Sequence, residues 1–177
     1  DKAGIPIVEV GHGNGLAASS LLIGKSLHTD EEMLTTAKRN LTKSKLGIHM
    51  IPGLATLKDA LKAKSYGVEV FRVATHCTEA TLSKSHITNL RQQDVEVYGV
   101  LMMSALVDTK TLTAQAKLME DYGAHAVIIM DSTGTYLPKD VNERISALKD
   151  HLSIPVGFHA HNNLGCAISN TLVAEIR

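Results

Sequence analysis

Val156-Gly157-Phe158-His159-Ala160-His161-Asn162-Asn163 is the stretch that indicates both a fold and a chemistry. It follows a proline and leads through Leu164-Gly165 into a helix-like segment, so it predicts a buried strand that ends at the histidines. Alternate residues of a strand face the same way, which aims His159 and His161 in one direction. Such a pair can bind a divalent metal; alternatively, one histidine packs in the core and the other caps a turn.

Five similar apolar runs precede this one, and each ends in a small, polar or histidine-containing turn. The six runs are 7–10, 47–51, 68–74, 96–103, 126–130 and 156–159. Helix-like segments separate them, with helix-start signals at Thr29 with Glu32, Thr56 with Asp59, Asp108 and Pro138. From the third run onward the strand-helix unit repeats roughly every 28 to 29 residues, which predicts one α/β domain. Parallel α/β proteins keep their active sites at the carboxyl ends of the strands.

The expected architecture is a (β/α)8 TIM barrel rather than an open doubly wound sheet. Gly11-His12-Gly13-Asn14-Gly15 is glycine-rich, but it lacks the Gly-x-Gly-x-x-Gly spacing of a dinucleotide-binding sheet. A complete barrel has about 250 residues and two more units than the six seen here. We therefore expect residues 1–177 to form a partial TIM-barrel catalytic domain, without its first strand, last strand and C-terminal helical region.

The composition excludes several classes of partner. Eighteen basic and eighteen acidic residues cancel without a block of like charge, so nothing favours nucleic acid or a membrane surface. No apolar run of about eighteen residues predicts a membrane span. The two cysteines, Cys77 and Cys166, lie far apart in the sequence and suit a reducing cytoplasm. A small neutral or anionic ligand is expected.

The six predicted strand ends favour metal-assisted chemistry. None of them carries a lysine, so a Schiff-base aldolase mechanism has no candidate there. A catalytic metal site usually takes about three protein ligands, and His159 with His161 supplies two. The third is expected to be a carboxylate, from Glu9, Asp131 or a strand outside this sequence. Mn, Co, Fe and Zn all suit this set of ligands.

Other residues at the strand ends have weaker signals. Ser132 follows the strand before the histidines and could bind an anionic group of a ligand, or it could simply form the turn that leads to Pro138. Glu9 lies in an apolar strand and needs a partner, which favours a supporting role at the site. His76 and Cys77 are adjacent and therefore expected on opposite strand faces, which argues against a catalytic cysteine-histidine couple.

Five motifs, in this order, resemble those of the 4-hydroxy-2-oxovalerate aldolases. They are Ile7-Val8-Glu9-Val10-Gly11-His12-Gly13, Arg72-Val73-Ala74-Thr75-His76-Cys77-Thr78-Glu79-Ala80, Met102-Met103-Ser104, Asp131-Ser132-Thr133-Gly134 and His159-Ala160-His161-Asn162-Asn163-Leu164-Gly165. These aldolases belong to a group of metal-dependent lyase barrels that includes 3-hydroxy-3-methylglutaryl-CoA lyase and the isopropylmalate and homocitrate synthases. The resemblance covers nearly the whole chain.

The resemblance implies a reaction and roles for four residues. His159 and His161 would be metal ligands, usually for Mn²⁺, Ser132 would contact the pyruvyl part of the substrate, and Glu9 would support the metal site. The implied reaction is retro-aldol cleavage of 4-hydroxy-2-oxopentanoate, a 2-oxo acid, to pyruvate and acetaldehyde. An acylating acetaldehyde dehydrogenase is the implied partner of the full-length protein.

The sequence departs from the family pattern in one respect. The family's Arg-Asp-Gly strand end, with its arginine and its carboxylate ligand, has no counterpart among these residues, and the histidine that serves as base is missing with it. Two alternatives therefore stay open: another lyase or synthase of the group that acts on a CoA thioester, and a catalytically inert fragment.

Overall fold

The computed structural model describes residues 1–176, which divide into two compact units. Unit 1 comprises Asp1–Val73 and Asn89–Val97, and unit 2 comprises Ala74–Thr88 and the residues from Tyr98 onward. The chain passes between the units within β3 (Val70–His76), α3 (Lys84–Leu90) and β4 (Glu96–Met102). Each unit is a layer of parallel strands with helices, and each is described separately below.

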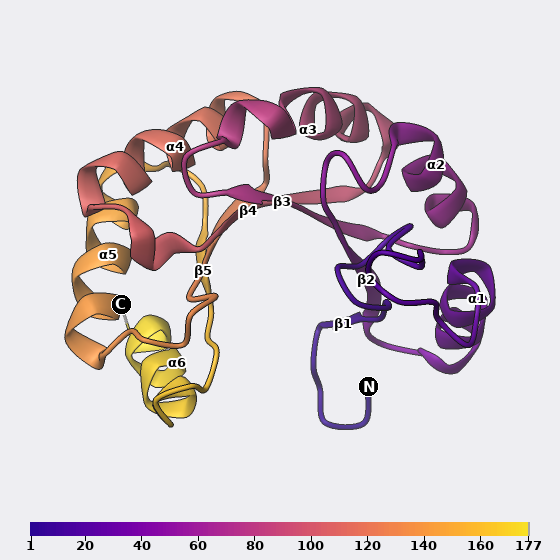
Figure 1. Ribbon diagram of the computed structural model, residues 1–177, viewed down its shortest axis with the longest axis horizontal. Coiled ribbons are helices and arrows are strands. Elements are labelled where there is room, and N and C mark those ends of the chain that lie inside the picture. Colours follow the sequence, from indigo (N-terminus) through magenta and orange to yellow (C-terminus); the bar gives the residue numbers. More distant parts are fainter. Residues whose placement is uncertain (177) are drawn as a thin grey trace. The chain divides into compact units, whose positions relative to one another are not determined.

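Unit 1 contains β1 (Ile7–Glu9), β2 (Lys45–Met50) and the first part of β3, together with α1 (Asp30–Asn40), α2 (Leu57–Ser65) and η2 (Arg91–Gln93). The strands pair in parallel and in sequence order, with Val8 opposite Leu46 and Ile48 opposite Phe71. Figure 1 shows residues 1–65 of this unit in indigo and purple, with α1 and α2 as the connections between successive strands. Leu46, Ile48 and Phe71 are fully buried and form its core.

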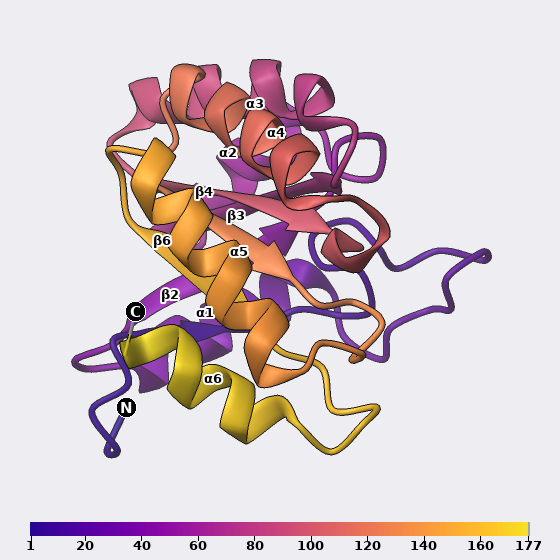
Figure 2. The ribbon, with the colours of Figure 1, turned by 90° about the vertical axis from the view of Figure 1, so that its left-hand side faces the viewer.

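Unit 2 begins in β3 and carries the predicted histidine pair. It contains η1 (Ala80–Ser83), η3 (Ser104–Leu106), α4 (Thr109–Asp121), β5 (Ala126–Met130), α5 (Pro138–His151), β6 (Val156–His159) and α6 (Ala167–Ile176). β4, β5 and β6 pair in parallel, with Leu101 opposite Ile129 and Met130 opposite His159. Helices α4 and α5 cover the same face of these strands (Figures 1 and 2). The carboxyl ends of β3 to β6 lead into the loops that carry the candidate site residues.

The six predicted strands are all present. β5 and β6 have the predicted bounds, and the other four differ by a few residues. The third strand begins at Val70 instead of 68 because the end of α2 uses the preceding residues. Gly67 has φ 100°, Gly67 N donates to Lys64 O and Val68 N donates to Ala63 O, the pattern of a Schellman C-cap. Residues 67 and 68 therefore belong to the helix end.

The predicted helix starts are confirmed. Thr29 with Glu32 and Thr56 with Asp59 form reciprocal capping boxes, the Asp108 side chain accepts from Thr111 N, and Pro138 is the first residue of α5. None of the helices within residues 1–176 combines the length and the apolar character needed to cross a bilayer. The alternation of strand and helix thus follows from local signals in the sequence.

The capping box of α2 gives a prediction about stability and pH. Replacing Thr56 by alanine is expected to lower the free energy of unfolding by about 1 kcal/mol at pH 7, because a helix N-terminal donor loses its acceptor. Hydrogen bonds from the Thr56 side chain and backbone hold the pKa of Asp59 below its usual value. The stabilisation from this depressed pKa is complete above the pKa of an unfolded aspartate, about 3.9, and is lost as the pH falls through the folded pKa.

Urea unfolding of the wild type and of Thr56→Ala at pH 7 and pH 3 measures this effect. The difference between the two proteins is expected to shrink at pH 3. Thr36→Ala is the matched control, because Thr36 is exposed within α1 and alanine favours a helix. A Thr56→Ala difference that is the same at both pH values would contradict the role given to Asp59.

Candidate metal site at the carboxyl ends of the strands

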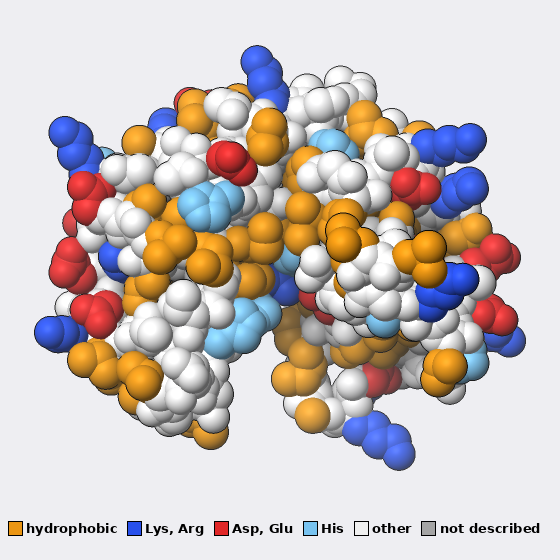
Figure 3. All heavy atoms as spheres, viewed as in Figure 1, with side chains coloured by type: hydrophobic (Ala, Val, Ile, Leu, Met, Phe, Trp, Pro, Cys, Tyr) orange, Lys and Arg blue, Asp and Glu red, His pale blue; other side chains and the backbone are white. Residues whose placement is uncertain are grey.

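The two histidines lie side by side, although only one of them is in the strand. β6 ends at His159, and His161 lies in the loop that follows. The sequence predicts that the two histidines pair through the alternation of side chains along a strand. That explanation is wrong, because the strand ends before His161. The loop brings them together instead, with ring centroids 4.9 Å apart and the ring planes tilted by 41°. Figure 3 shows several histidine side chains next to hydrophobic ones on the face in view.

The hydrogen bond of His161 determines which of its ring nitrogens can bind a metal. Its Nδ1 lies 2.7 Å from the backbone carbonyl oxygen of Asp131. A carbonyl oxygen only accepts, so Nδ1 carries the proton and Nε2 keeps its lone pair. Histidines that bind metals are usually held in this way, by a second hydrogen bond from the other ring nitrogen. The residues present thus fit a divalent metal at this pair.

Asp131 holds the loop after β5 rather than serving as a ligand. Its side chain is fully buried, and both carboxylate oxygens accept hydrogen bonds: Oδ1 from Thr133 Oγ1 and Thr135 N at 3.1 Å each, and Oδ2 from Tyr136 N at 3.0 Å. Its backbone N donates to His159 O at 3.0 Å. The sequence suggests Asp131 as a candidate third metal ligand, and this assignment is wrong because the carboxylate holds the loop instead. Residues 1–176 include no group of three or more His, Cys, Asp or Glu side chains able to hold a metal ion.

The hydroxyl group of Ser132 can donate a hydrogen bond to a ligand. Its Oγ accepts the backbone N–H of Met103 at 2.8 Å, and within residues 1–176 its own proton has no acceptor. Half-buried at the end of β5, it can donate to a ligand. The turn that the sequence suggested as the alternative role is made by Asp131 and the residues after Ser132, so the Ser132 side chain is available.

Glu9 has the partner that its apolar surroundings demanded. The Nη1 atom of Arg72 lies 3.1 and 3.2 Å from the two carboxylate oxygens of Glu9. Glu9 also lines a cavity of about 630 Å³ in unit 1, together with His28, Glu32 and Met33. The histidine pair and Ser132 belong to unit 2. A supporting role for Glu9 at the metal therefore stays a prediction.

Cys77 is a hydrogen-bond donor in the core. His76 and Cys77 were expected on opposite faces of one strand, but β3 ends at His76 and Cys77 lies beyond it. Cys77 Sγ lies 3.9 Å from His76 Nδ1. The thiol donates to Met103 O at 3.3 Å, and burial raises its pKa. A thiol that stays protonated is a weak nucleophile, which supports the prediction that this pair is not a catalytic couple.

A network that sequence reasoning missed fixes the loop between β5 and α5. The buried Tyr136 hydroxyl donates to Ser104 Oγ at 2.9 Å, and Ser104 Oγ donates to Met130 O at 2.7 Å. Burial raises the pKa of Tyr136 to about 12. The Arg144 guanidinium lies 5.0 Å from the centre of the Tyr136 ring, and Phe158 stacks with that ring at 6.2 Å. These contacts connect the loop that carries Ser132 to η3, α5 and β6.

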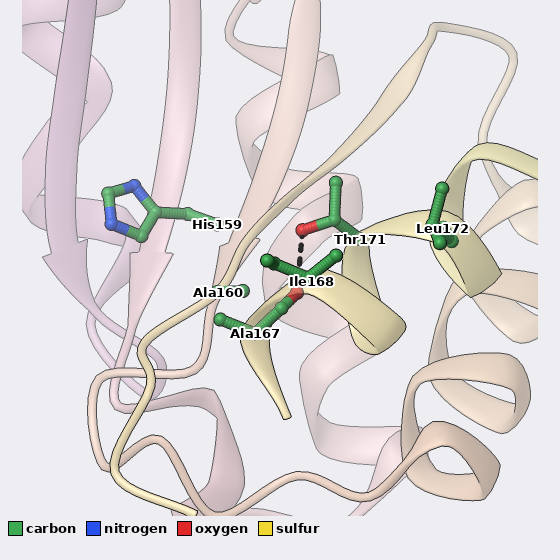
Figure 4. A pocket seen from close by; sticks show the side chains of 6 residues that line it. All are labelled: His159, Ala160, Ala167, Ile168, Thr171 and Leu172. Carbon is green, nitrogen blue, oxygen red and sulfur yellow. Dashed lines mark hydrogen bonds between the residues drawn. The ribbon is translucent and has the colours of Figure 1, made fainter. Parts of the chain in front are cut away.

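A cavity of about 420 Å³ adjoins His159. Its lining residues are His159, Ala160, Ala167, Ile168, Thr171 and Leu172. Figure 4 shows His159 at the end of β6 and the last four of these on α6, where the Thr171 hydroxyl donates to Ala167 O at 2.9 Å. Apart from the histidine and the threonine the lining is aliphatic, which suits a small, partly apolar ligand.

Parallel strands joined by helices, with a histidine pair after one of them, are the arrangement expected of part of a (β/α)8 barrel. The family model described as HMGL-like matches residues 1–176, and the chain belongs to the HMGL-like family. A 4-hydroxy-2-oxovalerate aldolase of Spirochaeta aurantia is 57% identical over 175 residues, which cover 98% of this chain and 51% of that protein. One of Serratia proteamaculans is 52% identical over 174 residues, with 98% and 52% covered. The chain spans about half the length of these relatives.

Solved structures agree on the fold. The carboxyl transferase domain of Rhizobium etli pyruvate carboxylase, with pyruvate and biocytin, has a TM-score of 0.76 at 18% identity, covering 84% of this chain and 28% of that one. The complete multifunctional pyruvate carboxylase of the same organism gives the same TM-score and identity, with 84% and 16% covered. At this identity the likeness concerns the fold alone.

Proposed function

We propose that the full-length protein cleaves 4-hydroxy-2-oxopentanoate to pyruvate and acetaldehyde with the help of a divalent metal. The observation that carries the proposal is the histidine pair, in which the Asp131 carbonyl fixes the tautomer of His161 with Nε2 available to a metal. Relatives named 4-hydroxy-2-oxovalerate aldolase, at 57% and 52% identity over nearly all of this chain, support this choice of reaction. Residues 1–177 are then part of the catalytic barrel domain.

We assign roles to the residues of this chain as follows. His159 and His161 hold the metal, and Ser132 donates its free proton to a carboxylate or oxo oxygen of the 2-oxo acid. Asp131 orients His161 through its carbonyl. Glu9, held by Arg72, supports the metal site. A divalent cation bound here would supply positive charge where the C2 oxygen becomes negative.

The retro-aldol cleavage needs no second substrate, oxidant or reductant. A base removes the proton of the 4-hydroxyl group, the C4–O bond becomes the carbonyl of acetaldehyde, and the C3–C4 bond breaks. Its electron pair forms the enolate of pyruvate across C2 and C3, and C3 then takes a proton. Within this scheme Ser132 binds and orients the part of the substrate that becomes pyruvate, and a hydrogen bond from it also stabilises the growing negative charge.

Membership of a family of metal-dependent lyases supports a divalent metal, and we propose Mn²⁺. We propose a small 2-oxo acid as the substrate and an acylating acetaldehyde dehydrogenase as the partner of the full-length protein. The cytoplasm is the proposed location, since both cysteines of the chain, Cys77 and Cys166, are free thiols.

Metal removal and addition test the proposed function. Full-length protein stripped of metal is expected to release little pyruvate from racemic 4-hydroxy-2-oxopentanoate, and added Mn²⁺ is expected to restore release. Pyruvate is measured by its reduction with lactate dehydrogenase and NADH. No release from folded, metal-loaded protein would reject the aldolase assignment, and turnover of a CoA thioester by that protein would replace it.

A further inference from the structure

Met103 has a backbone conformation that is rare for its residue type. It follows β4 directly, with φ 57° and ψ 31°, in the left-handed region. Residues with a side chain seldom adopt this region, and glycine adopts it readily. The surrounding contacts must therefore hold Met103 there.

Three hydrogen bonds fix the two peptide groups of Met103. Its N–H donates to Ser132 Oγ at 2.8 Å. Its carbonyl oxygen accepts from the Cys77 thiol at 3.3 Å and from Leu106 N at 2.9 Å. Cys77 follows β3, Met103 follows β4 and Ser132 follows β5, so three successive strand ends of unit 2 are linked through one residue.

The bond to Ser132 has a directional effect. The Met103 N–H occupies one lone pair of the Ser132 oxygen, which fixes that oxygen and leaves its O–H to point elsewhere. The φ and ψ angles of Met103 set the angle between its two peptide groups, so outside the left-handed region its N–H and its carbonyl oxygen could not both keep these partners. Without the N–H bond, the Ser132 hydroxyl would rotate more freely. The conformation of Met103 thus determines whether the Ser132 hydroxyl is already oriented to donate a hydrogen bond before a ligand binds.

We propose that Met103 is a positioning residue, whose left-handed peptide holds the Ser132 hydroxyl as a hydrogen-bond donor to a 2-oxo acid. The Cys77 thiol holds the other end of the same residue through its carbonyl. The backbone of Met103 acts here, and its side chain is dispensable. This inference rests on the proposed function, because that proposal supplies the ligand.

Two substitutions separate the backbone from the side chain. Met103→Gly deletes the side chain and keeps the left-handed conformation, whereas Met103→Val keeps an apolar side chain and disfavours that conformation. With full-length protein and a fixed Mn²⁺ concentration, pyruvate binding is measured by calorimetry and the KM and kcat of cleavage by assay. Met103→Gly is expected to bind like the wild type. Met103→Val and Ser132→Ala are each expected to weaken pyruvate binding about tenfold, the usual cost of one hydrogen bond to a charged group.

A double-mutant cycle tests the link between the two residues. In the Ser132→Ala background, Met103→Val is expected to cause no further loss. Cys77→Ala is a milder variant, for use if the valine protein does not fold, and is expected to weaken binding about threefold only when Ser132 is present. Equal losses in Met103→Gly and Met103→Val would overturn the proposal, as would losses that add to that of Ser132→Ala.

One readout does not depend on the reaction. The Met103 amide is expected to exchange its hydrogen more slowly in the wild type than in Ser132→Ala, by NMR, and equal rates would overturn the link. Wild-type protein that neither binds pyruvate nor cleaves the substrate, but keeps this protection, would reject the proposed function and the ligand assigned to Ser132, not the link between Met103 and Ser132.

Discussion

Replacing His161 by alanine is expected to lower Mn²⁺ affinity and metal-stimulated pyruvate release by more than about a hundredfold, since loss of a hydrogen-bonding partner behind a ligand alone costs 10- to 100-fold. The variant removes one of two imidazoles whose rings are 4.9 Å apart. It leaves the Asp131 carbonyl with the Gly134 N–H as a donor at 3.0 Å, so the loop after β5 keeps its own hydrogen bonds. The fold is therefore expected to survive while the metal is lost.

The matched control for this substitution is His151→Ala. His151 is an exposed histidine at the end of α5 whose Nδ1 also bonds to a backbone carbonyl, that of Ala147, at 2.7 Å. Its loss is expected to change neither metal affinity nor pyruvate release. Calorimetry with Mn²⁺ and the pyruvate assay, both on full-length protein, measure the two effects. An unchanged Mn²⁺ affinity in His161→Ala would move the metal site away from this pair.

Replacing Gly134 by alanine is expected to destabilise the protein by about 2 to 4 kcal/mol, because backbone strain and overpacking add. Gly134 has φ 62°, and a Cβ there would lie 2.6 Å from Asn163 N, 2.7 Å from Asn163 Cβ and 3.1 Å from His161 C. The Gly134 carbonyl accepts from Leu164 N at 3.1 Å. The two loops that carry Ser132 and His161 touch at this glycine, so the methyl group must push them apart.

The expected functional result is a loss of metal-stimulated pyruvate release by about a hundredfold or more, since a displacement of about 1 Å at a catalytic group can cost that much. Gly165→Ala is the control that separates the effect of the contact with Asn163 from the effect of backbone strain. Gly165 also has a positive φ, of 73°, and lies in the same loop as His161, but a Cβ there would meet nothing within 4 Å. Urea unfolding and the pyruvate assay compare the two variants. Equal losses in both would show that backbone strain, and not the contact with Asn163, is responsible.

Much of the fold could be predicted because its signals are local. Capping boxes, Pro138 and apolar runs act over three to eight residues, and all of them are found where the sequence predicts them. The bounds of four strands differ from the predicted ones by a few residues, and at the third strand the helix cap at Gly67 explains the difference. Family membership then fixed the barrel class.

The site was predicted less completely because its geometry depends on contacts between loops. The pattern His159-x-His161 was visible, but the strand alternation used to explain it ends at His159. Asp131 looked like a ligand because a sequence shows a carboxylate and not the N–H groups that occupy it. No residue type signals the left-handed Met103, since methionine is as rare there as other residues with side chains.

The acceptor of the hydrogen bond that sets the tautomer of His161 is a main-chain carbonyl. This hydrogen bond is therefore less sensitive to mutation than one to a side chain. Every amino acid at position 131 brings the same carbonyl, so no side-chain replacement there can delete the acceptor; it can act only by moving the loop. The path of the backbone therefore sets the tautomer of this ligand. A substitution at position 131 that keeps the path of the loop would still present Nε2 of His161 to a metal.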